Sequence, residues 1–194
     1  PLDPQYYYFD QNYVNSNNNY MVDFLEGTNT AYPDLTELID IGNGWQGDHF
    51  GYRRDIWVLR ITNEDPAYGA IEAKPPFFLY ANVHAREVTT PEMAIRYIKY
   101  LTTGYNGLGG YNVDPDVTWL VDHQAVYILV SANPDGHRVN EANTLADRRK
   151  NMNNASCSTG SCTYRWTGSP FTSGLLLFSV LTRGMAEPSE YPVS

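Results

Sequence analysis

His84 and Glu87 are the first residues of this chain whose types and spacing point to chemistry. They stand three residues apart, directly after an apolar run at residues 77–83. A neutral imidazole and a carboxylate are both good zinc ligands, and catalytic zinc sites often combine two histidines with one glutamate. Ligands of α/β proteins also bind where strands of the sheet end. The pair is therefore predicted to hold a metal, although an isolated pair of this kind is more often just solvated or hydrogen-bonded.

A second polar group follows another apolar run, at residues 125–132. The tetrapeptide 133–136 (Asn-Pro-Asp-Gly) ends that run, and the tripeptide 149–151 (Arg-Lys-Asn) begins sixteen residues after Asn133. Taken alone, the tetrapeptide predicts a turn and the basic residues a solvated patch. Beside a metal that activates a carbonyl, however, the guanidinium of Arg149 would stabilise the developing oxyanion.

The elements that must position these groups alternate between strands and helices. Thr89 and Thr90, followed by a proline and a glutamate, predict a capped helix start, and Gly104 predicts its end. A short helical turn is expected at 119–122. The mixture predicts an α/β protein in which helices flank a central sheet. Strands are expected at residues 35–41, 55–62, 77–83 and 125–132, and helices at 20–31 and 89–104.

Length and composition restrict the function further. The chain has 194 residues, enough for one domain with a real core. Its formal net charge of -9 disfavours nucleic acid as a partner, because phosphate binding requires a basic surface. No apolar run reaches membrane-spanning length, so a membrane partner is not expected. The chain opens at Pro1, which we interpret as a processed product or a fragment. Cys157 and Cys162 are consistent with either a small-loop disulfide or two free thiols.

Together, the three motifs resemble those of the zinc metallocarboxypeptidases of the carboxypeptidase A/B type. His84-Ala85-Arg86-Glu87, the Asn-Pro-Asp-Gly tetrapeptide and the Arg-Lys-Asn tripeptide occur in the order and rough spacing of that family. The resemblance covers roughly residues 20–154, while 155–194 are atypical. It implies that 1–194 form a single, truncated peptidase domain with the mixed, helix-flanked sheet of that family.

The resemblance also implies roles for individual residues. His84 and Glu87 correspond to the first two ligands of a Zn²⁺ ion. Arg149 resembles the arginine that polarises the scissile carbonyl, with Arg148 as the alternative. Arg86 resembles a residue that lines the substrate cleft, although a surface salt bridge is an equally good interpretation. The implied protein is a secreted exopeptidase that hydrolyses the C-terminal peptide bond of peptides and proteins; the oligomeric state is not implied.

Parts of the family pattern are missing from this chain. The family's second histidine ligand and its glutamate general base would come later, yet the four histidines are His49, His84, His123 and His137. A catalytic zinc normally has three protein ligands. We therefore expect hydrolysis by this chain to be slow or absent. The alternatives are a catalytically inactive relative that serves as a binding module and, with less support, a zinc amidohydrolase acting on small acylated amino acids.

Overall fold

The structure is a computed structural model, which describes residues 20–44, 55–108 and 113–141. The helix predicted at 20–31 and the one predicted at 89–104 are both confirmed. The four predicted strands also form, with ends that differ from the prediction by at most three residues. The elements are α1 (Tyr20–Ala31), β1 (Thr36–Asn43), β2 (Asp55–Ile61), the 3₁₀ turns η2 (Pro66–Tyr68) and η3 (Ile71–Ala73), β3 (Pro76–Tyr80), α3 (Thr89–Gly104), η4 (Tyr105–Gly107), α4 (Pro115–His123), β4 (Ala125–Leu129) and α5 (Pro134–Glu141).

The four strands form one mixed sheet in the order β1-β2-β4-β3. β2 pairs antiparallel with both β1 and β4, whereas β3 and β4 run parallel. The parallel pair ends in register, with Tyr80 opposite Leu129. Residues that follow β3 and residues that follow β4 are therefore brought to the same edge of the sheet. The His84-Ala85-Arg86-Glu87 motif and the tetrapeptide 133–136 both lie at this end of the sheet.

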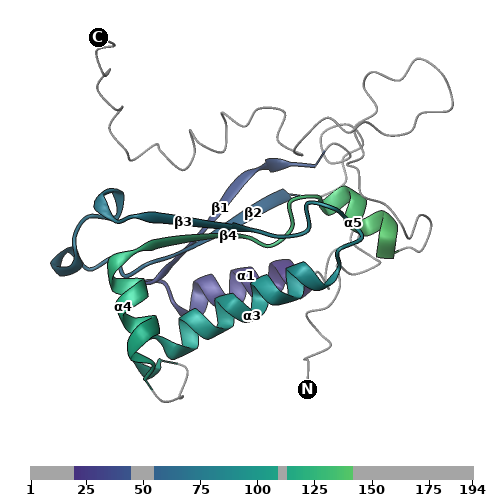
Figure 1. Cartoon of the computed structure of the whole chain (residues 1–194). Helices are drawn as coiled ribbons and strands as arrows, with labels where there is room; N and C mark the ends of the chain where they lie inside the picture. Colours follow the sequence, from purple (N-terminus) through teal and green to yellow (C-terminus); the bar gives the residue numbers. More distant parts are fainter. Residues whose placement is uncertain (1–19, 45–54, 109–112, 142–194) are drawn as a thin grey trace, which may run out of the picture.

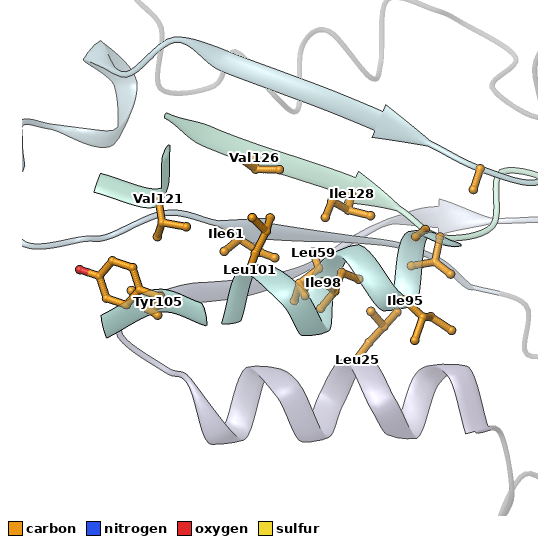
Figure 2. Close-up of a cluster of buried hydrophobic side chains, with 14 of the residues drawn as sticks. Leu25, Leu59, Ile61, Ile95, Ile98, Leu101, Tyr105, Val121, Val126 and Ile128 are labelled. Atoms are coloured by element: carbon orange, nitrogen blue, oxygen red, sulfur yellow. The ribbon is translucent and has the colours of Figure 1, made fainter. Parts of the chain in front are cut away.

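The main hydrophobic core lies between the sheet and the helices α1 and α3, which cover one of its faces (Figure 1). Figure 2 shows Leu25 from α1 and Ile98 from α3 pointing toward the strand residues Leu59 and Ile128. All four are 0% exposed. Burial of each such side chain contributes about 1.5–3 kcal/mol, which makes this layer the main source of stability. Among the described segments, no helix combines the length and apolar character that crossing a membrane requires.

A buried polar cluster closes the end of the sheet where β3 and β4 begin. The Asn63 amide donates to the Tyr105 hydroxyl at 2.9 Å and to Asp122 Oδ1 at 2.8 Å, and Tyr105 also donates to Asp122 Oδ1 at 2.8 Å. The Lys74 ammonium donates to the Asn63 carbonyl and to the Thr62 hydroxyl. Burial lowers the pKa of Lys74, with nearby Asp122 opposing the change. Burial and then the bond to Asp122 raise the pKa of Tyr105.

Three local predictions are wrong. The third strand was expected to run through Val83, but β3 ends at Tyr80, and its residues Phe77 and Tyr80 are 46% and 58% exposed. Within the described sheet β3 is an edge strand, so only one side of it is paired. The short turn predicted at 119–122 is the full helix α4. The Asn-Pro-Asp-Gly turn is instead the start of α5.

Candidate metal centre

His84 and Glu87 lie side by side in the loop that follows β3. His84 Nδ1 is 2.8 Å from Glu87 Oε1. A backbone hydrogen bond of 2.9 Å from the Glu87 amide to the His84 carbonyl closes a tight turn between them. The turn contains residues 84–87, and the side chains of its first and last residues meet on the same side of the loop. They are 24% and 45% exposed, so the pair is accessible to a ligand from solvent.

The loop that carries His84 and Glu87 is held in place by Asn82, a buried residue that was not predicted from the sequence to have a role. Asn82 has a φ of 55° and is 1% exposed. Its amide nitrogen donates to the Ala85 carbonyl at 3.2 Å and to the His84 carbonyl at 3.4 Å. Its Oδ1 accepts from the Ser131 hydroxyl at 3.1 Å, which fastens the loop to the end of β4. The sequence did contain one signal for this role, because asparagine tolerates the left-handed conformation and Asn82 lies just past an apolar strand.

Asn133 explains why the tetrapeptide 133–136 begins a helix. Its Oδ1 accepts from the Gly136 amide at 3.0 Å, and its carbonyl accepts from the His137 amide at 2.9 Å. Asn133 thus acts as the N-cap of α5, with Pro134 in the first helical position, where the missing N–H costs nothing. The Asn133 amide nitrogen also donates to the Val83 carbonyl at 3.4 Å. The tetrapeptide 133–136 is therefore in direct contact with the loop that carries His84 and Glu87.

Gly136 is required by the close approach of α5 to the His84 loop. A Cβ atom at this position would lie 2.8 Å from the Ala85 Cβ and 2.8 Å from the Asn133 side-chain amide. A Cβ atom at Gly44, directly after β1, would likewise lie 2.7 Å from Oδ2 of the Asp135 carboxylate. These two glycines thus allow β1, α5 and the His84 loop to pack together at the end of the sheet where β3 and β4 finish.

The helix α3 begins directly after the pair, but not as expected. The residue before its first turn is Val88, whose side chain makes no capping bond. The Thr90 hydroxyl instead donates to the Glu87 carbonyl at 2.8 Å and accepts from the Asn82 amide at 2.9 Å. The predicted cap was wrong because this hydroxyl serves the loop and not the helix. Gly104 does end α3, as predicted.

Of the other residues singled out from the sequence, some are described by the structure and some lie outside the described residues. Arg86 is exposed and lies between the two candidate ligands, so the cleft and the salt-bridge interpretations both remain open. Arg149, its alternative Arg148 and the two cysteines lie outside the described residues, as does His49. His123 is an exposed histidine that stacks on Trp119 and hydrogen-bonds its carbonyl at 2.8 Å.

The donor chemistry of the pair fits two positions of a zinc site. An imidazole nitrogen and a carboxylate oxygen face each other at 2.8 Å, and zinc binds both atom types. A third ligand is not supplied nearby: in the described segments, no three His, Cys, Asp or Glu residues gather into a possible metal site. His137 is only 2% exposed, inside α5, and does not complete such a group.

Comparison with known proteins matches the chain to one family. Residues 21–168 match the family model described as zinc carboxypeptidase. A zinc carboxypeptidase of Saccharothrix mutabilis subsp. capreolus is 36% identical over 112 residues, which are 58% of this chain and 22% of that protein. Mouse carboxypeptidase M is 31% identical over 58% of this chain and 22% of its own length. The chain thus spans about a fifth of the length of these relatives.

Solved structures support the same fold. Thrombin-activatable fibrinolysis inhibitor superposes with a TM-score of 0.65 at 18% identity, over 86% of this chain and 43% of that one. A carboxypeptidase A from Helicoverpa armigera superposes with a TM-score of 0.53 at 23% identity, over 74% of this chain and 29% of its own. These identities are low enough that they establish the fold alone. The family match over more than half of the chain identifies this chain as a member of the zinc carboxypeptidase family.

Proposed function

We propose that this chain carries the first part of the site of a zinc-dependent exopeptidase that removes residues from the C-termini of peptides and proteins. The observation that supports this most directly is the His84–Glu87 pair, an accessible nitrogen and oxygen 2.8 Å apart at the carboxyl edge of the sheet. Family membership supports peptidase chemistry, and the relatives it matches are named carboxypeptidases. In this proposal residues 1–194 belong to a single peptidase domain that acts outside the cell.

Each residue of the pair has a defined part in the proposal. His84 Nδ1 and Glu87 Oε1 hold the metal, because these are the atoms that face each other. When bound, zinc supplies a Lewis acid that polarises a carbonyl and lowers the pKa of a water. Arg149, or its neighbour Arg148, binds the oxygen on which negative charge develops. Arg86 contacts the substrate on the side away from the terminal residue.

A binding module without catalytic activity is the second candidate. It is favoured by the shortage of ligands, since the described residues bring only two metal-binding groups together. Two ligands hold zinc more weakly than the three of a catalytic site. Such a module would still bind peptide C-termini through its arginines, without hydrolysing them.

The test combines metal binding with peptide processing. Calorimetric titration of the purified chain with zinc is compared with that of His84→Ala and Glu87→Gln, and a peptide substrate is followed by mass spectrometry. We expect weak one-to-one binding that falls at least tenfold in either variant. Stepwise loss of C-terminal residues in the presence of zinc, abolished by His84→Ala, supports the enzyme. Peptide binding without hydrolysis supports the binding module.

Two results would contradict the proposal. Zinc binding that survives both substitutions unchanged would remove the pair from the metal site. Tight zinc binding with rapid hydrolysis would contradict the claim that the site is incomplete. His123→Ala is the matched control, because this exposed histidine lies in α4, away from the pair, and its loss should leave zinc binding unchanged.

A further inference from the structure

We infer that Asn82 is a positioning residue, which fixes the backbone on both sides of the His84–Glu87 pair and so sets the geometry of the metal site. This inference rests on the proposed function for its meaning, but its structural part can be tested without metal. Asn82 does not face the two ligand atoms itself. Its bonds run to backbone carbonyls and to the hydroxyls of Ser131 and Thr90, and Asn82 itself is almost fully enclosed, at 1% exposure.

The backbone conformation of Asn82 is the first part of the argument. Its φ of 55° lies in the left-handed region, which residues with a Cβ rarely enter. Asparagine tolerates this region better than most residues with a side chain. Two residues after the end of β3 at Tyr80, this conformation redirects the chain, so that the next residues leave the sheet and form the loop. An alanine at this position would disfavour that change of direction.

The side-chain amide is the second part. Its nitrogen donates to the carbonyls of Ala85 and His84, at 3.2 and 3.4 Å. The His84 carbonyl is also the acceptor of the Glu87 amide, so this bond lies within the turn that joins the two candidate ligands. Oδ1 is held in turn by the Ser131 hydroxyl. The amide is therefore anchored at one end on β4 and holds the loop with the other.

The main-chain amide of Asn82 is the third part. It donates to the Thr90 hydroxyl at 2.9 Å, and this hydroxyl donates to the Glu87 carbonyl at 2.8 Å. Asn82 thus reaches the His84 backbone directly and the Glu87 backbone through one hydroxyl. Exposed His and Glu side chains have considerable rotamer freedom. A fixed backbone under both is therefore the main device by which this loop limits their separation.

Asn63 provides a matched control at the opposite end of the sheet. It is also a buried asparagine, at 7% exposure, and its amide nitrogen likewise makes two hydrogen bonds. Its partners are Tyr105 and Asp122, however, and not the loop. Loss of either side chain should lower the global stability. Only loss of the Asn82 side chain should act specifically on the pair.

The experiment compares Asn82→Gly with Asn63→Gly by hydrogen exchange and by metal titration. Glycine permits a positive φ, so Asn82→Gly removes the amide bonds and leaves the backbone conformation accessible. We expect exchange at the Glu87 and Thr90 amides to accelerate at least tenfold beyond the change in global stability. Asn63→Gly should accelerate exchange only in proportion to its loss of stability. Zinc affinity should fall about tenfold in Asn82→Gly alone, as is typical when a partner of a metal ligand is removed.

Ser131→Ala is a milder second variant that keeps Asn82 and removes only the anchor of its Oδ1. It should accelerate exchange at Glu87 by a smaller factor, which keeps the inference testable if Asn82→Gly does not fold. The inference is overturned if Asn82→Gly and Asn63→Gly change exchange at Glu87 to the same extent, or if Ser131→Ala leaves it unchanged. If the unmodified chain binds no zinc, the proposed function fails, and the exchange data still decide the role of Asn82.

Discussion

The two ends of the sheet are both closed by buried polar residues, but they use them differently. At the end where β3 and β4 begin, Asn63, Tyr105 and Asp122 bond to one another and satisfy each other's polar atoms. At the end where those strands finish, the side-chain amides of Asn82 and Asn133 donate to backbone carbonyls of the His84 loop. The first arrangement joins elements together. The second shapes a loop and leaves its two most reactive side chains exposed to solvent.

One end of the sheet therefore contributes mainly to stability, and the other end mainly to the geometry of the candidate site. A polar cluster whose members are paired and buried costs little while intact, but loss of one member leaves the others unsatisfied. Substitutions there should change the free energy of unfolding. Substitutions beneath the His84 loop should change the geometry of the pair more than the stability of the fold.

The largest effect is expected from Asp122→Ala. Asp122 accepts two hydrogen bonds of 2.8 Å and lies near the buried ammonium of Lys74. Removing this carboxylate takes the acceptor from two buried donors and the largest favourable charge from Lys74, and breaking such a buried group typically costs about 3–5 kcal/mol. Urea denaturation would measure the loss. Asp116→Ala, an exposed acid on the same helix, should change stability by less than about 1 kcal/mol, and equal losses in the two variants would contradict the special role of the cluster.

A smaller loss of stability is expected from Gly136→Ala. The added Cβ would lie 2.8 Å from the Ala85 Cβ, which requires α5 and the His84 loop to move apart. Overpacking of this kind costs about 1–3 kcal/mol, and zinc affinity should fall with it because the loop moves. Gly27→Ala is the control, since nothing lies within 4 Å of a Cβ there and the glycine is inside α1. That variant should gain about 0.5–1 kcal/mol. If both substitutions stabilise, α5 does not constrain the loop.

The smallest effect at neutral pH is expected from Tyr105→Phe, which removes one buried hydroxyl at a cost of about 1 kcal/mol. The pKa of Tyr105 is raised on folding, so its contribution is fully present below the unfolded value near 10 and is lost as pH rises toward the folded value. The stability difference between the two proteins should therefore narrow above about pH 10. Denaturation between neutral and alkaline pH measures this, and a constant difference would show that the hydroxyl does not titrate with folding.

Local patterns were sufficient for much of the fold. The apolar periodicity of residues 89–104 predicted α3, because one face of a helix must be buried whatever it packs against. The apolar run at 125–132 predicted β4 for the same reason. The proximity of His84 and Glu87 also follows from local spacing, since three residues close one turn. Their roles as zinc ligands, and that of Arg149, remain proposals.

Other predictions failed where one pattern serves two structures. Asn, Pro, Asp and Gly are common in turns, and the same asparagine and proline are favoured at the start of a helix. The contacts of Asn133 with Val83 and of Gly136 with Ala85 favour the helix in this protein. These contacts could not be predicted from the sequence, because the two residues in each of them are about fifty positions apart in the chain.

From its amino acids alone, this chain is an α/β protein of a recognisable family with a candidate metal-binding pair after its third strand, because periodicity and short spacings are local properties. Which strand lies at the edge, how α5 approaches the His84 loop, and the role of Asn82 in holding that loop were decided only by the tertiary structure. Each of these depends on contacts between residues distant in sequence, and a hydrogen bond such as that from Ser131 to Asn82 has no local signature.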